Sequence, residues 1–107
     1  MLTFSKARRL AETWVEVTCG KEVELIRDAA IAKPYGWVFF YQSSAHLRDP
    51  DDFSSALIGN SPFLIDRDSG EIKVFGMARD TAFYLKEFES TLPPGQIYRK
   101  PEQPIWS

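Results

Sequence analysis

The side chains best suited to catalysis are few in this chain of 107 residues. The single cysteine, Cys19, and the single histidine, His46, are the one pair that could serve as a nucleophile and its base. Cys19 is expected near the C-terminal end of a helix, where the negative end of the helix dipole disfavours the thiolate that a nucleophile requires. We therefore predict that Cys19 is a buried structural thiol and that His46 is a surface residue.

Carboxylates stand close together in two places, Glu22 with Glu24 and Asp49 with Asp51 and Asp52. Neither group has the ligand spacing of a calcium loop, and one histidine with one cysteine is too few for a structural zinc site. No Gly-x-Ser-x-Gly elbow and no phosphate-binding glycine loop occur. The sequence predicts no catalytic residue, no metal site and no cofactor, and hence a protein that is not an enzyme.

Two amphipathic helices are expected to flank the strands. The first begins after Thr3 or Ser5 and ends at Gly20, and the second begins after Asp80 and stops at the prolines of residues 93–95. The spacing of apolar residues predicts two buried stripes. They are Ala7, Leu10, Ala11, Trp14, Val17 and Thr18 in the first helix, and Tyr84, Leu85, Phe88 and Leu92 in the second.

The strand at residues 36–42 is apolar on both faces. Trp37, Phe39 and Tyr41 alternate with Val38 and Phe40, so the strand must lie mid-sheet with a cover on each side. An extended segment at residues 23–32, bent near residues 28–29, is expected to fold back onto it. A hairpin of residues 63–66 and 72–75 turns at Gly70, and an irregular loop at residues 43–58 closes at residues 59–62.

These elements predict an α+β domain in the order α-β-β-β-β-α, an antiparallel four-stranded sheet with its helices packed on one face. We expect residues 1–107 to form a single domain, with a core at 1–95 and a C-terminal extension at 96–107. Ile97, Ile105 and Trp106 should pack this tail back on the domain, where it or another protein would cover the second sheet face. The residues expected to be buried are Trp14, Trp37, Phe39, Phe63, Ile65, Val74, Leu85 and Phe88.

Composition narrows the cellular context. The net charge of -2 without a basic stripe argues against a nucleic-acid partner. No segment has the length of a membrane span or the apolar run of a signal peptide, so no membrane association is expected. A single cysteine excludes an internal disulfide, which suits a reducing, cytoplasmic location.

Four motifs carry a family resemblance. They are Gly36-Trp37-Val38-Phe39-Phe40-Tyr41, Gly59-Asn60-Ser61-Pro62 running into Phe63-Leu64-Ile65-Asp66, Ser69-Gly70-Glu71, and Gly76. In order and spacing they resemble the bacterial YrhB domain, also called immunity protein 35, over roughly residues 5 to 92. Position 61 is usually glycine or alanine in that family, so Ser61 is a mild departure.

The resemblance implies a small cytoplasmic bacterial protein that binds and neutralises a cognate polymorphic toxin. It supplies no catalytic residues. The shared residues are best explained as structural, in the core for Trp37 and Phe39 and in turns for Gly59, Asn60, Pro62 and Gly70. A minority of relatives are described as heat-shock or chaperone-like proteins.

Three functional hypotheses remain open. An immunity protein would contact a basic toxin through the loop of Arg48, Asp49, Asp51, Asp52 and Phe53, although aspartates beside Pro50 are also explained by a turn alone. A chaperone-like module, or a homodimer, would use an apolar sheet face that the tail leaves open. An enzyme with an unrecognised site is the third, which a reactive Cys19 or an ordered metal would support.

Overall fold

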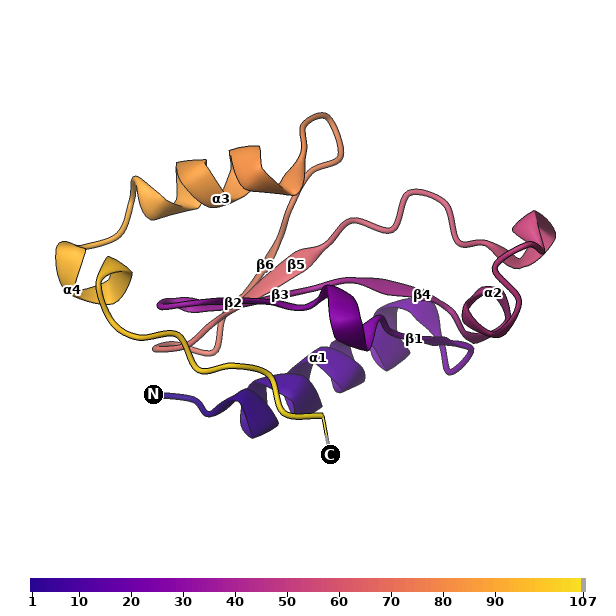
Figure 1. Cartoon of the computed structure of the whole chain (residues 1–107), viewed down its shortest axis with the longest axis horizontal. Helices are drawn as coiled ribbons and strands as arrows, with labels where there is room; N and C mark the ends of the chain where they lie inside the picture. The colour runs from indigo at the N-terminus through magenta and orange to yellow at the C-terminus, as the bar shows by residue number, and fades with distance from the viewer. Residues whose placement is uncertain (107) are drawn as a thin grey trace.

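The computed structural model describes residues 1–106, in which a central antiparallel sheet lies between two helices (Figure 1). The main sheet contains four strands in the order β2-β3-β5-β6, and a two-stranded sheet pairs β1 with β4. The predicted α+β class and four-stranded antiparallel sheet are confirmed. The strands are β1 (Val23–Leu25), β2 (Ile31–Lys33), β3 (Gly36–Phe39), β4 (Tyr41–Ser43), β5 (Phe63–Asp66) and β6 (Ile72–Val74).

The bend expected near residues 28–29 is a short 3-10 turn, η1 (Arg27–Ala29). It divides the expected first strand into β1 and β2, which pair with β4 and β3 respectively. The facing strand is interrupted at Phe40, whose carbonyl accepts a 2.8 Å hydrogen bond from the Ile26 N–H. The two sheets are thus joined through one bend rather than separated by a loop.

Helix α1 (Phe4–Cys19) covers one face of the sheet and has the expected ends. Thr3 caps its first turn, and Gly20 ends it with a φ of 94°. The buried side chains are Phe4, Ala7, Ala11 and Val15, which contact the face of Trp37 and Phe39. The predicted stripe is wrong at three positions, because Leu10 is 39% and Val17 80% exposed and Thr18 is exposed as well. The predicted and the observed buried stripes of α1 share Ala7 and Ala11. These small residues allow the helix to approach the aromatic face of the sheet.

Helix α3 (Thr81–Glu89) covers the opposite face, as Figure 1 shows. Asp80 caps it as expected, and Leu85 packs in a second core cluster with Val38 and Leu64. The prediction that the helices share one face is therefore wrong. Since successive residues of β3 and β5 are apolar on alternate sides, each face requires a helix of its own.

Three further helical segments lie where none was expected. α2 (Ser44–Arg48) and the 3-10 turn η2 (Phe53–Ser55) occupy the loop predicted to be irregular. α4 (Pro94–Ile97) begins at the second of the two prolines that were expected to stop the last helix. A proline is tolerated at the first position of a helix, because the N–H it lacks has no partner there.

The tail packs back on the domain as predicted, but on the face that α1 also covers. The Trp37 Nε1–H donates a 2.7 Å hydrogen bond to the Glu102 carbonyl, and the Phe4 N–H donates to Glu102 Oε1 at 3.0 Å. The Trp106 ring lies 5.1 Å from the Phe4 ring, centre to centre. Ile105 is 68% exposed and does not act as an anchor. Ser107 lies outside the described residues.

Most of the predicted core is confirmed. Trp14 and Phe88 are half-buried at its margin. The prediction that Val74 is buried is wrong. Its side chain is 47% exposed, because β6 is an outer strand of the sheet. The buried members of the predicted set are Trp37, Phe39, Phe63, Ile65 and Leu85.

No helix among residues 1–106 combines the length and the apolar character needed to cross a bilayer.

Candidate partner-binding surface

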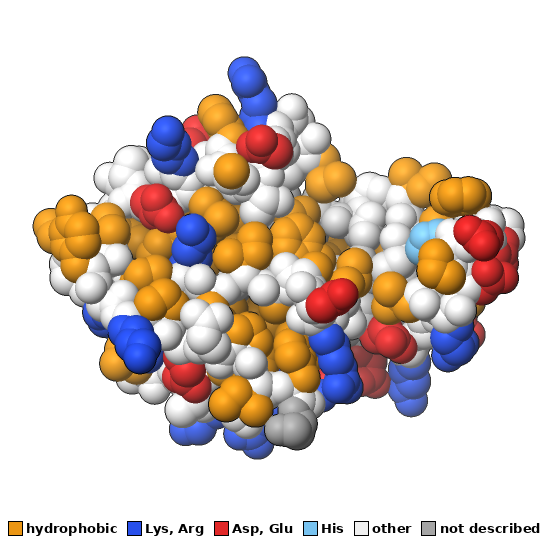
Figure 2. Space-filling model, in the orientation of Figure 1, with side chains coloured by type: hydrophobic (Ala, Val, Ile, Leu, Met, Phe, Trp, Pro, Cys, Tyr) orange, Lys and Arg blue, Asp and Glu red, His pale blue; other side chains and the backbone are white. Residues whose placement is uncertain are grey.

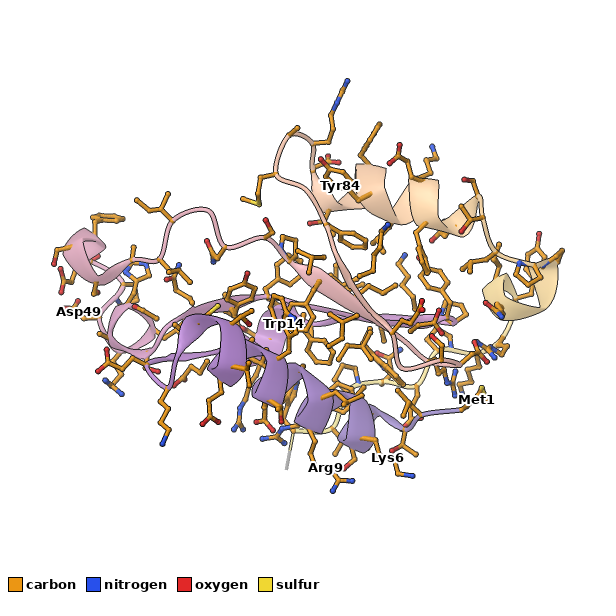
Figure 3. The ribbon with its side chains drawn as sticks, turned by 180° about the vertical axis from the view of Figure 1, so that it is seen from behind. Met1, Lys6, Arg9, Trp14, Asp49 and Tyr84 are labelled. Atoms are coloured by element: carbon orange, nitrogen blue, oxygen red, sulfur yellow. The ribbon has the colours of Figure 1, made fainter. Side chains whose placement is uncertain are left out.

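The predicted contact residues lie together at one end of the molecule, from the last residue of α2 to the first residue of η2. We call residues 48–53 the acidic tip. Figure 3 shows Asp49 at the end of the long axis opposite Met1. Arg48, Asp49 and Asp51 are exposed, Asp52 is half-buried, and Phe53 is 78% exposed.

Two serines fix the ends of this loop. Ser43 Oγ accepts a 3.0 Å hydrogen bond from the His46 N–H, which starts α2, and its hydroxyl donates to the Ser55 carbonyl. Ser44 Oγ donates to Glu24 Oε2 at 2.7 Å, which ties α2 to β1. The acidic tip is therefore held on a defined frame, which limits the conformational entropy that a bound partner would have to remove.

Asp52 is a structural member of the tip. Its carboxylate accepts hydrogen bonds from the Ser54 N–H and hydroxyl, and these bonds hold the pKa of Asp52 below its usual value. His46 is half-buried rather than a free surface residue, and its Nδ1 lies 3.0 Å from the Asp52 carbonyl. The turn explanation therefore applies to Asp52. The side chains of Asp49 and Asp51 make no hydrogen bond or ion pair within residues 1–106.

Two large apolar side chains stand beside the tip. Phe53 is 78% and Ile58 91% exposed, and the Phe53 ring lies 6.1 Å from that of His46. Figure 2 shows hydrophobic and acidic side chains gathered around the histidine at this end. Sequence reasoning missed Ile58, because an isoleucine in a loop is normally expected to turn inward.

The return loop at residues 56–62 is pinned to β4. The Gln42 side chain bonds both the N–H and the carbonyl of Leu57, and Asn60 Nδ2 donates to the Tyr41 carbonyl at 2.6 Å. Gly59 has a positive φ of 77°, whereas the φ of Asn60 is not positive. Pro62 is buried at the start of β5.

An acidic groove continues this surface along α1. It has a volume of about 470 Å³, an apolar floor at Val15 and Leu25, and carboxylates at Glu12, Glu16 and Glu24. An adjoining groove of about 510 Å³ extends toward the tip between the residue 21–22 turn and α2. Sequence reasoning missed Glu12 and Glu16, because only the packing of α1 beside β1 brings them to this end.

Other candidate chemistry gains no support from the geometry. Within the part of the chain that the structure describes, no group of three or more His, Cys, Asp or Glu side chains could hold a metal ion. Cys19 is half-buried at the end of α1 and packs against the core.

The remaining motif residues have structural positions. Trp37 and Phe39 are fully buried, and Gly70 takes a φ of 76° in the β5–β6 turn.

Comparison with known proteins provides the family. YrhB of Escherichia coli strain K12, described as an uncharacterized protein, is 41% identical over 54 residues, which are 50% of this chain and 56% of YrhB. The chain thus spans about half the length of the curated relative it matches. No solved structure matches it. The family model of immunity protein 35 matches residues 5–91, which include the β3 strand, the loop at residues 59–62 and α3. The chain therefore belongs to the immunity protein 35 family, which is typically non-enzymatic.

Proposed function

We propose that this protein neutralises a toxin protein by binding it through the acidic tip. The observation that carries the proposal concerns Asp49 and Asp51, whose side chains make no hydrogen bond or ion pair within residues 1–106. They lie beside the exposed ring of Phe53, on a frame held by hydrogen bonds. Tight protein interfaces combine an aromatic anchor with a polar rim, and this surface offers both.

The charge of the surface favours a basic partner. The tip and the two grooves together contain seven carboxylates and two basic side chains, whereas the whole chain has a net charge of only -2. Such a field accelerates the encounter with a positively charged surface and repels an acidic one. Binding within the cytoplasm is consistent with the single unpaired Cys19.

Association kinetics test this role of the tip. The toxin to be tested is sought among the proteins of adjacent genes, and its binding is measured by surface plasmon resonance. We expect Asp49→Lys/Asp51→Lys to slow association at least tenfold, because steering turns into repulsion. Asp28→Lys/Glu87→Lys is the matched control, since it makes the same change of net charge at exposed residues outside the tip.

The side chains of the two aspartates are exposed and make no hydrogen bond or ion pair within residues 1–106. The tip variant should therefore unfold at the same urea concentration as the wild type. Equal association rates for the tip and control variants would show that the toxin binds elsewhere. Phe53→Ala separates the anchor from the charge, because it should raise the dissociation rate and leave association nearly unchanged.

No observation favours the chaperone-like alternative. It required an apolar sheet face that the tail leaves open. α1 and the tail cover the face of Trp37, and α3 covers the face of Val38 and Leu64. Neither face therefore offers a broad apolar patch to an unfolded client.

A further inference from the structure

Strand β6 is an outer strand of the main sheet, and its backbone has a free side. The Glu71 carbonyl accepts a 2.9 Å hydrogen bond from the Asp66 N–H, and the Phe75 N–H donates to the Pro62 carbonyl at 2.9 Å. Because backbone groups alternate in direction along a strand, those of Ile72 and Val74 point away from β5. They can pair with a further strand.

The space beside this edge is open. A groove of about 690 Å³ lies between β6 and α3, with Lys73, Val74 and Phe75 on the strand side and Tyr84 and Phe88 on the helix side. Val74 is 47% exposed. An unpaired strand edge presents free backbone N–H and C=O groups and is a template for strand addition.

The charges on the edge are complementary to themselves. Glu71 and Lys73 are two residues apart, so they lie on the same face of the strand, and both line the groove. Neither forms an ion pair with any residue in the range 1–106. An antiparallel copy centred on Ile72 would place each Glu71 opposite a lysine and each Lys73 opposite a glutamate.

We propose that two copies of this chain pair antiparallel through β6 and form one continuous sheet. Ile72 lies opposite Ile72 of the partner subunit, and the two residues exchange both backbone hydrogen bonds. Glu71 faces Lys73 of the partner subunit at the adjacent positions, where cross-strand side chains are closest. The register centred on Lys73 is disfavoured because it brings two lysines together.

This contact is a two-fold interface in which both subunits use the same residues, so it closes at a dimer and does not propagate into a fibre. The acidic tip lies at one end of the long axis, away from β6 (Figure 1). Each dimer therefore presents two tips, and self-pairing does not depend on the function proposed for them.

Reciprocal charge variants test the pairing without any toxin. Lys73→Glu gives an edge with two acidic residues, and Glu71→Lys gives an edge with two basic ones. Sedimentation equilibrium from micromolar to millimolar concentration should show a wild-type dimer, and each variant should self-associate about tenfold more weakly, because both cross-strand ion pairs become repulsive. An equimolar mixture of the two variants should restore the dimer.

Asp28→Lys is the control for the net charge of Glu71→Lys, because both substitutions change it by the same amount, and it should dimerise like the wild type. Glu71 and Lys73 are exposed, so neither substitution should disturb folding. A wild-type chain that stays monomeric at every concentration would overturn the proposal and show that Lys73 guards the edge against pairing. A dimer that persists unchanged in both variants would also overturn it, because the contact would then lie elsewhere.

Discussion

Gly36 is the residue where the packing of the sheet leaves least room. A Cβ atom at this position would lie 2.2 Å from the carbonyl oxygen of Ile65, a backbone atom of the neighbouring strand. Its φ is not positive, so the glycine is required by the close approach of β5 rather than by a special backbone conformation. Gly59 is the reverse case, with a φ of 77° and no atom within 4 Å of the added Cβ.

Substituting Gly36 tests this close approach. We expect Gly36→Ala to lower the free energy of unfolding by about 3 kcal/mol, because β3 and β5 must separate to admit the methyl group. Gly95→Ala is the matched control. Its Cβ would meet nothing within 4 Å in α4, so its stability should stay within about 1 kcal/mol of the wild type. Urea unfolding measures both, and equal stabilities would contradict the predicted clash.

The C-terminal tail is the element whose position depends most on side chains distant in sequence. Arg99 makes two hydrogen bonds to the Asp68 carboxylate, at 2.9 and 2.7 Å. Arg67 Nη1 donates to the Lys100 carbonyl at 3.0 Å, and Arg8 Nη1 to the Trp106 carbonyl at 2.6 Å. The turn between β5 and β6 and the first turns of α1 thus hold the tail in place.

The ion pair between Asp68 and Arg99 predicts a pH dependence. The guanidinium of Arg99 lowers the pKa of Asp68 below its usual value of 3.8. The carboxyl group therefore stabilises the fold above about pH 3.8, and this contribution is lost as the pH falls through the lowered pKa.

Asp68→Asn is the variant that checks this linkage. We expect it to cost about 1 kcal/mol at pH 7, the upper end for an exposed pair. The difference from the wild type should shrink when urea unfolding is repeated near pH 3. A difference that is independent of pH would show that the ion pair does not anchor the tail.

Charge is distributed unevenly over the whole molecule. Carboxylates gather on the tip and on its grooves, whereas Lys6 and Arg9 lie on α1 between the middle of the molecule and Met1, away from Asp49 (Figure 3). Because the whole chain carries a net charge of only -2, the remainder of the molecule is net positive. A charged partner would therefore be oriented before contact as well as attracted.

Ionic strength provides the test at this scale. The association rate with the candidate toxin should fall as salt rises from about 0.01 to 0.15 M, because the screening length shrinks from about 30 to 8 Å. The dissociation rate should change little. The association rate of Asp49→Lys/Asp51→Lys should depend less steeply on salt concentration than that of the wild type. An equal salt dependence would indicate that other charges steer the encounter.

Local signals in the sequence determined much of the fold. The caps at Thr3 and Asp80, the turn at Gly70 and the two-faced apolar pattern of residues 37–41 act over a few residues, so the elements and the central strand could be predicted. The same holds for the acidic tip, whose members are adjacent in the chain.

Only the tertiary structure decided which element covers which face, because periodicity shows that a face is buried but does not identify its cover. This is why α3 and not the tail lies over Val38, and why Val74 is exposed on an outer strand. The grooves beside the tip have the same origin, since Glu12 and Glu24 come together only when α1 packs beside β1. Contacts between residues distant in the chain therefore set the surface on which the proposed function depends.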